Sequence, residues 1–516
     1  MKYPIGVQSF EKLRKEGFVY VDKTALVYKM VTEGTAYFLS RPRRFGKSLL
    51  LSTLQAYFEG KRELFTGLAI EGLEKEWKEY PVLHLDLNAE RYATLGELEN
   101  ILDTYLQEWE RTYGSDQIGN SSLSQRFRAV IRNAKQKTGS NVVVLIDEYD
   151  KPILQAIGND ALQDEFCSAL KAFYGVLKSA DADLRFTLLT GVTKFGKVSV
   201  FSDLNNLRDI SMSEHYSGVC GISEVELHTS FDDVVESFAV HNNQTKNEAY
   251  EEFRKRYDGY HFSPGTPGMY NPFSVLWTLS EGRYGSYWFA TGTPTYLVEL
   301  LKKSNFRLKD LSNLEVAQDD LESIHRADIN PIPVLFQSGY LTIKEYNERF
   351  KLYILDYPNE EVREGFVKFL LPYYTHLRSQ QSQALISQFV LSLENGDANR
   401  FMQLMQSLMA GIPYELVREL ENHYQNVMYI ITKLMGFYVQ AEYHTSNGRI
   451  DLLIGTDEYV YIIELKFEGS AKDALEQINN KDYALPFNTT GKQIIKIGAN
   501  VSKETRNVDE WIVDKN

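Results

Sequence analysis

The chain has 516 residues, a formal net charge of −14 and 43% hydrophobic residues, which is typical of a soluble globular protein with room for about three domains. The acidic balance argues against a protein whose whole surface coats nucleic acid, but it is compatible with a local basic groove. The two cysteines, Cys167 and Cys220, favour neither a disulfide framework nor a cysteine-based zinc site. The sequence has no apolar run long enough for a bilayer and no apolar signal core at its start, so we expect a cytoplasmic protein without a membrane partner.

The first predicted elements lead into a loop that contains Gly-Lys-Ser. Residues 10–14 have helical spacing, and residues 18–24 combine an extended piece with a helix start at Asp22 or Thr24. On this pattern alone, these two side chains are helix caps. The apolar run 37–39 then predicts a strand that ends directly before the loop.

The loop itself is Arg41-Pro42-Arg43-Arg44-Phe45-Gly46-Lys47-Ser48, and a helix-like run follows it at residues 49–54. Strand, tight loop, Gly-Lys-Ser and helix form the context that a phosphate-binding loop needs. We expect N–H groups at the helix N-terminus to hold phosphate, Lys47 to reach the β- and γ-phosphates of ATP, and Ser48 to bind Mg²⁺. The nucleotide-binding residues expected from this loop are Arg43, Arg44, Phe45, Gly46, Lys47 and Ser48.

The loop departs from the usual pattern, because Arg41 stands where a glycine normally opens it and further arginines replace small residues. These arginines either disturb the wrap around the phosphates or add cationic donors to it. The alternative without a function is a basic corner between a strand and a helix.

A second signal lies at residues 141–148, where a continuous apolar run ends in Asp147 and Glu148. Such a run is typical of a strand buried on both faces of a parallel sheet, and ligands bind beyond the carboxyl ends of such strands. We expect Asp147 to hold Mg²⁺ and Glu148 to orient or deprotonate the attacking water. The alternative is a strand that ends in a solvated acidic turn.

Strands and helices alternate around these two motifs. Strands are expected at residues 80–87 and 184–193, and helices at 95–113, 122–137 and 161–178. This βαβ succession predicts a parallel sheet with helices on both faces. Thr190 or Thr193, at the end of the last strand, is a candidate sensor of the γ-phosphate, and Thr190 is assigned to the nucleotide site; the alternative is a hydroxyl that satisfies a backbone group at the strand end.

The middle of the chain is less regular. Residues 220–282 indicate helices with turn-rich loops, which suits a small lid over a nucleotide. Farther on, helices surround two strands at 337–343 and 350–355, which suggests a winged-helix-like unit. Such units bind DNA or act as spacers, and the pattern does not decide between these roles.

The last hundred residues carry the second chemical signal. Strand-like runs lie at 438–443, 449–454, 459–466 and 494–497, with an Asn447-Gly448 hairpin turn and a helix from Ala471 that contains Gln477 and Tyr483.

Two carboxylates and a lysine come together in this predicted sheet. Glu464 and Lys466 share one face of their strand, and Asp451 can lie beside them on the neighbouring strand. Two carboxylates in one site repel unless a cation lies between them, and oxygen ligands suit Mg²⁺ or Mn²⁺. Lys466 can then position or activate a metal-bound water that attacks a phosphodiester, and Glu421 adds a carboxylate from the preceding helix. The alternative is an exposed Glu–Lys ion pair with an unrelated aspartate.

On these motifs the first part of the chain resembles the AAA-ATPase-like family of uncharacterised bacterial proteins. The stretches that carry the resemblance are residues 20–24, 40–48, 146–152 and 189–195. The resemblance implies that Arg41 is a family feature and that residues 22–24 do more than cap a helix.

The last part resembles the RecB-like branch of the PD-(D/E)xK nuclease superfamily. The residues that match its motifs are Asp451, Glu464, Lys466, Gln477, Tyr483 and the helical acid Glu421, with Ile450 in place of the proline. The resemblance implies that Glu421, Asp451 and Glu464 bind the metal. It also implies that Asp451, Glu464, Lys466 and Gln477 are the catalytic residues of the nuclease site. The catalytic residue expected at the separate ATP site is Glu148.

Together the resemblances imply an α/β chain in three parts. These are a P-loop NTPase parallel sheet with a helical lid at residues 1–280, a helical or winged-helix-like region at 281–400, and a restriction-endonuclease-like α/β domain at 401–516. The expected function is ATP binding or hydrolysis joined to metal-dependent cleavage of nucleic acid, DNA ahead of RNA. The alternative is a nucleotide-dependent switch whose nuclease-like domain only binds nucleic acid or a protein, and a homo-oligomer is left open.

Overall fold

The computed structural model describes residues 1–88, 90–115, 121–194, 206–290, 295–304, 306–322, 330–375, 377, 379–412, 420–436, 440–443, 450–467, 469–502 and 504–515. The predicted Asn447-Gly448 turn lies outside these residues, and so does the side chain of Glu421. Among the helices of the described part, none is both long and apolar enough to cross a membrane.

The chain folds into two compact units. Unit 1 comprises Met1–Leu300 and Ser312–Val362, and unit 2 comprises Leu301–Leu311 and Arg363–Asn516. The three-part division at residues 280 and 400 stays a prediction.

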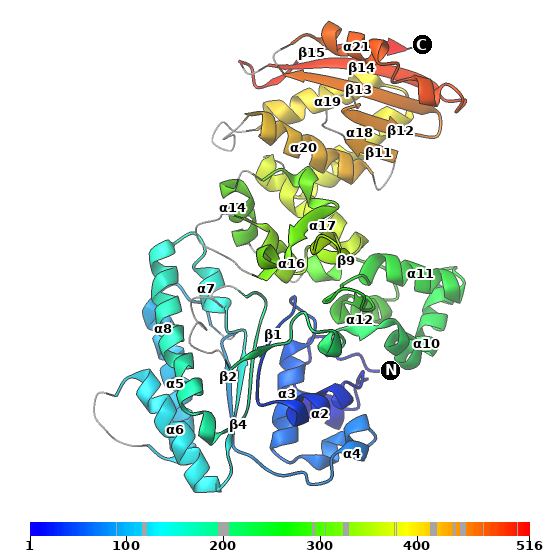
Figure 1. The fold of residues 1–516 in the computed structure, drawn as a ribbon. Helices are drawn as coiled ribbons and strands as arrows, with labels where there is room; N and C mark the ends of the chain where they lie inside the picture. Colours follow the sequence, from blue (N-terminus) through cyan, green and yellow to red (C-terminus); the bar gives the residue numbers. More distant parts are fainter. Residues whose placement is uncertain are drawn as a thin grey trace. The chain divides into compact units, whose positions relative to one another are not determined.

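A parallel sheet of five strands forms the centre of unit 1 (Figure 1). In spatial order its strands are β2 (Val82–Asp86), β3 (Val142–Asp147), β4 (Leu184–Gly191), β1 (Ala36–Ser40) and β5 (Arg208–Asp209). All four pairings are parallel, which confirms the predicted sheet type. Because β4 lies between β1 and β3, the segments after β1 and β3 emerge at the same end of the sheet, one strand apart.

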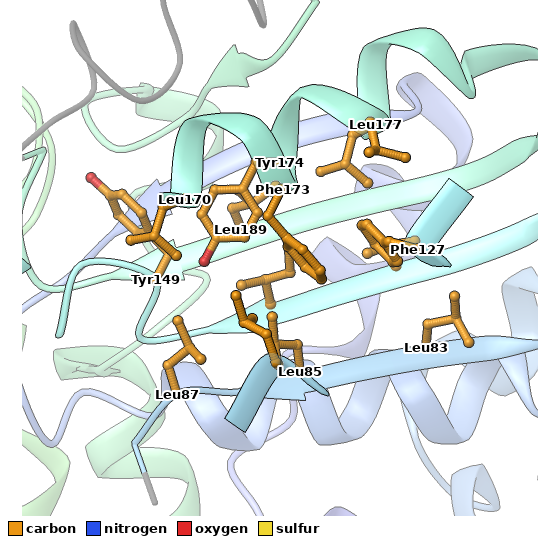
Figure 2. Close-up of a cluster of buried hydrophobic side chains, with 14 of the residues drawn as sticks. Leu83, Leu85, Leu87, Phe127, Tyr149, Leu170, Phe173, Tyr174, Leu177 and Leu189 are labelled. Carbon is orange, nitrogen blue, oxygen red and sulfur yellow. The ribbon is translucent and has the colours of Figure 1, made fainter. Parts of the chain in front are cut away.

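Helices cover both faces of this sheet, as predicted. One face carries α5 (Leu95–Tyr113), α6 (Leu123–Thr138) and α8 (Asp160–Ser179) (Figure 1). The other face is covered by α3 (Lys47–Phe58), and α2 (Thr24–Glu33) and α4 (Ala69–Leu73) lie on the same side of the sheet as α3 (Figure 1). Figure 2 shows the core on the first face, where leucines of β2 and β4 meet the aromatic rings of α6 and α8. The rings of Phe127 and Phe173 stack there with centroids 4.5 Å apart. Removing these side chains from water is the main favourable contribution to the packing of helices on the sheet.

Two of the three long helices on this face, α5 and α6, begin at a local sequence signal. Thr94 with Glu97 begins α5, and Ser122 with Gln125 begins α6. In each pair the hydroxyl accepts the N–H three residues on and the longer side chain reaches back, which satisfies donors that a helix N-terminus otherwise leaves unpaired. Two further short helices of unit 1 are α1 (Phe10–Lys15) and α7 (Lys151–Gln155).

Unit 1 continues with a helical layer, as expected for residues 220–282. It contains α10 (Glu224–His241), α11 (Lys246–Tyr257), α12 (Pro272–Glu281) and the short antiparallel strands β6 (Ile222–Ser223) and β7 (Met269–Tyr270). These elements share a hydrophobic core with side chains of the amino-terminal segment, including Val19 and Val21. The start of the chain is therefore packed against the helical layer.

The remaining elements of unit 1 surround a small antiparallel sheet, ordered β8-β10-β9. They are α13 (Tyr287–Ala290), β8 (Leu314–Ala317), α15 (Gln318–Glu322), α16 (Ile332–Gln337), β9 (Thr342–Asn347), β10 (Leu352–Asp356) and α14 (Thr295–Lys303), which begins in unit 1 and continues into unit 2. The strand predicted from Gln337 is wrong at its start, because Gln337 ends α16 and the strand begins at Thr342. Gly339 turns the chain between them with φ +87°, and a Cβ there would meet the ring of Pro42 at 2.7 Å.

Glu361 is a buried carboxyl in unit 1, and it gives a test of pH dependence. It is 3% exposed and accepts hydrogen bonds from the Trp288 N–H at 2.8 Å and the Ser274 hydroxyl at 2.7 Å. Burial raises the pKa of Glu361 from 4.5 to about 7. Between these values the folded chain keeps a proton that the unfolded chain has lost, so the free energy of unfolding falls as pH rises, by about 3 kcal/mol over the whole window.

We therefore expect Glu361→Gln to unfold at a midpoint that depends less on pH than the wild-type midpoint does. The unfolding midpoint of the variant minus that of the wild type, measured by thermal denaturation, should increase from pH 5 to pH 8. Glu360→Gln, at the half-buried neighbour, is the control and should follow the wild-type curve. Parallel curves for all three proteins would contradict the expectation.

Unit 2 has a mixed sheet ordered β11-β12-β13-β14-β15. Its strands are β11 (Gln440–Tyr443), β12 (Leu452–Gly455), β13 (Tyr459–Phe467), β14 (Gln493–Ser502) and β15 (Asn507–Lys515). The pair β13–β14 is parallel and the other pairs are antiparallel. Helix α21 (Ala471–Asn480) joins the parallel pair, as a crossover connection requires.

Helices lie on both faces of this second sheet (Figure 1). The larger helices of unit 2 are α18 (Ser379–Glu394), α19 (Ala398–Ala410) and α20 (Leu420–Met435), while α17 (Glu360–Tyr374) begins in unit 1 and continues into unit 2. Helix α21 packs directly on β14 at Gly498, where a Cβ would lie 2.3 Å from the carbonyl oxygen of Ala471. Only glycine allows this close approach of helix to strand.

Candidate functional sites

The predicted phosphate-binding loop lies between β1 and α3. Strand β1 ends at Ser40 and α3 begins at Lys47. Gly46 precedes the helix with φ +97°, a conformation that favours glycine, and no side chain caps the helix. The N–H groups of the first turn therefore lack a capping side chain, which is the arrangement that binds phosphate.

Lys47 is held by its own loop and by the acidic strand end. Its ammonium donates to the carbonyl oxygen of Arg41 at 3.1 Å and lies 3.2 Å from Oε1 of Glu148. Lys47 is buried, whereas Ser48, the next residue, is half-buried. The structure thus brings together the lysine of the loop and the second acid of the strand, which the sequence placed about a hundred residues apart.

Arg41 points into the protein. Its guanidinium is 1% exposed, donates to the carbonyl oxygens of Ser211 and Tyr216 and lies 3.9 Å from the ring centroid of Phe262. Burial lowers the pKa of Arg41 to about 10. The suggestion that this arginine adds a cationic donor to the phosphate wrap is therefore wrong, because its donors hold the loop against the segment after β5.

The other loop residues fall into two kinds. Phe45 is buried and packs edge-on against Tyr260. Arg44 is exposed with φ +65° and lies 5.0 Å from the ring of Phe273. Arg43 is half-buried, and its carbonyl oxygen accepts the indole N–H of Trp288 at 3.1 Å.

Asp147 and Thr190 form a direct pair at the carboxyl ends of β3 and β4. The Thr190 hydroxyl donates to Oδ1 of Asp147 at 2.6 Å, and the Glu148 N–H donates to the same oxygen at 3.0 Å. Asp147 is 2% exposed. Thr190 thus orients this carboxylate, and a contact of Thr190 with a γ-phosphate stays a prediction.

Asp150 completes the acidic turn, and the sequence analysis missed it. It is fully buried and accepts hydrogen bonds from the N–H and the hydroxyl of Thr193, each at 2.7 Å. Burial, with the charge of Glu148, raises the pKa of Asp150 to about 6. Gly191 must be small, since a Cβ there would lie 2.5 Å from Oδ1 of Asp150. The third acid in Asp-Glu-Tyr-Asp was the signal that could have drawn attention to it.

Asp22 and Thr24 join the start of α2 to the start of α4. Asp22 accepts the N–H and hydroxyl of Thr24 and the N–H of Ala69. The hydroxyl of Thr24 in turn accepts the N–H of Ile70, in the first turn of α4. The N-cap of α2 is Lys23, without a side-chain hydrogen bond, so the predicted capping of this helix by Asp22 or Thr24 is wrong.

An apolar cavity of about 100 Å³ opens beside the loop in unit 1. It is lined by residues of the amino-terminal segment, the loop, the start of α3 and the helical layer, among them Val19, Tyr20, Phe45, Cys220 and Leu276. Lys23, at its rim, forms an ion pair with Glu226 at 2.6 Å.

The second site lies on the face of the unit 2 sheet that carries α21. Asp451 directly precedes β12, Glu464 and Lys466 lie on β13, and Gln477 lies on α21. The amide N–H of Leu465 donates to Oδ2 of Asp451 at 2.9 Å. The structure therefore brings these four predicted residues together.

Gln477 links the acid and the lysine of this site. Its amide nitrogen donates to Oε1 of Glu464 and its amide oxygen accepts from the ammonium of Lys466. The ammonium lies 3.7 Å from the same Glu464 oxygen. Tyr483 is buried nearby, but it follows α21, which ends at Asn480, so its predicted place within the helix is wrong.

The two carboxyl groups of the site, on Asp451 and Glu464, are buried in a way that disfavours their charged forms. Burial raises the pKa of Asp451 to about 6, and burial together with the charge of Asp451 raises the pKa of Glu464 to about 7. Oε2 of Glu464 is buried without a hydrogen-bond partner among the described residues. A buried carboxylate oxygen without a donor is costly unless a proton or a metal ion satisfies it.

The donor set fits a hard divalent cation that keeps part of its water. The described residues contain no group of three His, Cys, Asp or Glu side chains that could hold a metal ion, so two carboxylates are what they supply here. Mg²⁺ commonly binds through one or two carboxylates and completes its shell with water and substrate phosphate. The ligand role of Glu421 stays a prediction, because its side chain is not described.

Comparisons with known proteins agree with this arrangement of two sites. A family model described as a predicted AAA-ATPase matches residues 4–201, and a PD-(D/E)XK nuclease superfamily model matches residues 419–511. A protein of Azotobacter chroococcum mcd 1, described as an uncharacterized protein in the vnfD 5′ region, is 34% identical over 523 residues and is covered over 99% of both chains. The chain belongs to the AAA-ATPase-like family. It carries a PD-(D/E)XK nuclease-superfamily domain at its C-terminal end.

The two family segments coincide with the two sites. The phosphate-binding loop and the Asp147–Thr190 pair lie within the AAA-ATPase-like segment, and Asp451, Glu464 and Lys466 lie within the nuclease segment. Two solved structures of Aeropyrum pernix also align with this AAA-ATPase-like chain. They are the ORC2 protein in ADPNP-ADP complexes (11% identity, 65% of this chain, 88% of that chain, TM-score 0.28) and the ORC1 protein in complex with DNA (10%, 68%, 93%, TM-score 0.25). At these TM-scores neither supports a conclusion about this chain.

Proposed function

We propose that this protein binds and hydrolyses ATP in unit 1 and cleaves nucleic acid in unit 2 with the help of a divalent metal ion. The observation that carries the proposal is the cluster of Asp451, Glu464, Lys466 and Gln477, with a buried Glu464 oxygen that has no partner among the described residues. We take DNA as the first candidate substrate.

In the nuclease site, Asp451 and Glu464 would hold the metal ion. Bound Mg²⁺ or Mn²⁺ supplies Lewis-acid stabilisation of the phosphate and a water of lowered pKa. Lys466 can donate to a nonbridging phosphate oxygen or to the attacking water, because Gln477 holds its ammonium beside Glu464. Gln477 also fixes the Glu464 carboxylate, which is the kind of positioning that makes a site effective before substrate arrives.

In the nucleotide site, the N–H groups of residues 43–48 would hold the phosphates and Asp147 would hold Mg²⁺ through its second oxygen. The Glu148 N–H and the Thr190 hydroxyl both donate to Oδ1 of Asp147, not to Oδ2. The ammonium of Lys47 has to leave Glu148 to reach the β- and γ-phosphates, and Glu148 then gains the freedom to orient a water. The apolar cavity beside the loop suits the base of the nucleotide.

A second candidate is a nucleotide-dependent switch in which unit 2 only binds its partner. The contact between Lys47 and Glu148 favours it, because ATP has to break this contact and so changes the loop. A ligand that prefers one conformation shifts the population towards it without turnover.

The deciding experiment is a cleavage assay with the full chain. Single- and double-stranded DNA and RNA are incubated with Mg²⁺ or Mn²⁺, with and without ATP. Lys466→Ala should lose cleavage, while Lys472→Ala, an exposed lysine of α21, should cut like the wild type. ATP dependence of the rate would link the two units.

The outcomes separate the two candidates. Metal-dependent cleavage that is lost in Lys466→Ala supports the nuclease. Cleavage that survives in Lys466→Ala places the activity outside this site. Absence of cleavage under every condition, with ATP binding intact, favours the switch.

A further inference from the structure

We infer that Trp288 is a positioning residue of the nucleotide site. Its indole N–H holds the Arg43 carbonyl and thereby fixes the direction of the Arg44 N–H, which meets the phosphates. This inference rests on the proposed ATP binding in unit 1 and deepens it. Trp288 lies outside the AAA-ATPase-like segment at residues 4–201, so the family model assigns it no role.

Trp288 anchors the phosphate-binding loop through a backbone carbonyl. The Arg43 oxygen accepts the indole N–H at 3.1 Å, and the peptide that follows is trans. In a trans peptide the C=O and the N–H lie in one plane and point in opposite directions. Holding the Arg43 carbonyl towards Trp288 therefore turns the Arg44 N–H away from the indole. This N–H donates to no backbone acceptor among the described residues, so it is available to an anion.

A second anchor on the same loop acts in the same way. The Phe45 oxygen accepts the N–H of Gly221 at 3.1 Å, and the Gly46 N–H also lacks a backbone acceptor within the described part of the chain. Arg44 and Gly46 both have positive φ, +65° and +97°. Positive φ at every second residue is the pattern that lets backbone N–H groups converge on an anion. The two anchors therefore hold the loop in a form that suits phosphate.

Arg44 depends on such an anchor because it is not a glycine. A side chain in the left-handed region costs free energy, and the conformation persists only where surrounding contacts determine it. Trp288 holds the peptide before Arg44, and the ring of Phe273 lies 5.0 Å from the Arg44 guanidinium. Loss of the indole N–H lets Arg44 relax, which turns its N–H away from the phosphates.

The place of Trp288 is fixed by contacts from three other segments of unit 1. Its backbone N–H donates to Oε1 of Glu361 at 2.8 Å, and Oε2 of the same carboxyl group accepts the hydroxyl of Ser274 at 2.7 Å. The Trp288 ring is buried and lies against that of Tyr340, with centroids 5.2 Å apart. The indole N–H therefore reaches the loop from a rigid support, as precise positioning requires.

The test measures binding of the slowly hydrolysed analogue ATPγS to the full chain, by competition with a fluorescent ATP analogue in Mg²⁺. Trp288→Phe removes the indole N–H and keeps an aromatic ring, so affinity should fall about fivefold, as expected for one neutral hydrogen bond. Inorganic tripolyphosphate has no base and should lose the same factor, because Trp288 acts on the phosphates. Trp277→Phe makes the same change at a half-buried tryptophan of α12 that stacks on Tyr287, and it should bind both ligands like the wild type.

A second variant separates the hydrogen bond from packing. Trp288→benzothienylalanine keeps the shape of the tryptophan ring and has sulfur in place of the N–H, so it should fold like the wild type and lose the same factor in affinity. Thermal denaturation verifies that each protein is folded at the assay temperature. Lower stability with wild-type affinity for both ligands would mean that Trp288 serves packing alone, and it overturns the inference.

The outcomes keep this inference apart from the proposed ATP site. Equal losses for ATPγS and tripolyphosphate in both Trp288 variants, with Trp277→Phe unchanged, support it. Weaker ATPγS binding with unchanged tripolyphosphate binding overturns it, because the effect then lies in the base, and ATP binding itself stands. A wild-type protein that binds neither ligand overturns both proposals.

Discussion

Asp451→Ala should reduce nucleic-acid cleavage by at least about a thousandfold, because several kcal/mol of transition-state stabilisation by the metal ion depend on its ligands. The variant removes one of the two carboxylates that would hold the ion and leaves the Leu465 N–H without its acceptor. ATP hydrolysis in unit 1 should remain. Initial rates of cleavage and of phosphate release, measured on the same preparation, check both statements.

The matched control is Asp457→Ala, which removes an exposed aspartate from the turn between β12 and β13. It should cut at the wild-type rate. A further sign of the metal site is direct Mn²⁺ binding, which Asp451→Ala should lose and Asp457→Ala should keep. Equal Mn²⁺ binding by both variants would contradict the assignment of Asp451 as a ligand.

Lys47→Ala and Glu148→Gln should change ATP binding in opposite directions. Removing the lysine takes away the cation that reaches the phosphates, so affinity for ATP should fall about a hundredfold or more. Neutralising Glu148 removes the carboxylate that lies 3.2 Å from the Lys47 ammonium. Affinity should then rise severalfold, because ATP no longer competes with Glu148 for the ammonium.

Hydrolysis should nevertheless fall in both variants. Glu148→Gln loses the group that would orient or deprotonate water, a contribution typically worth about 10²- to 10⁴-fold. Binding of a fluorescent ATP analogue and steady-state phosphate release separate the two effects. A Glu148→Gln protein that binds ATP more weakly than the wild type would show that the carboxylate supports the loop rather than competing with the nucleotide.

Local motifs were enough to predict the elements that carry the candidate residues of both units. Gly46-Lys47-Ser48 and the strand ending in Asp147 follow from the requirements of phosphate binding and of a buried parallel strand, and both elements lie where they were expected. The pair Glu464 and Lys466 follows from the two-residue period of a strand. These loop and strand patterns depend only on residues that are close together in the sequence, so they can be recognised from the sequence alone.

Contacts between distant segments could not be predicted in the same way. Lys47 meets Glu148, and the buried Asp150 meets Thr193, only because the order of strands brings their ends together. Arg41 was open to two interpretations, since its environment depends on residues about 170 positions away.

The division of the sequence between the two units also limits how they can be taken apart. The polypeptide passes from one unit to the other after Leu300, after Leu311 and after Val362. No single cut in the backbone therefore yields two complete pieces. A shortened chain that begins at residue 363 keeps the nuclease motif but lacks Leu308 and Phe306, so the Asn426 amide loses both of its partners in the core. Each unit consists of two separate stretches of sequence, so neither can be exchanged as one uninterrupted segment.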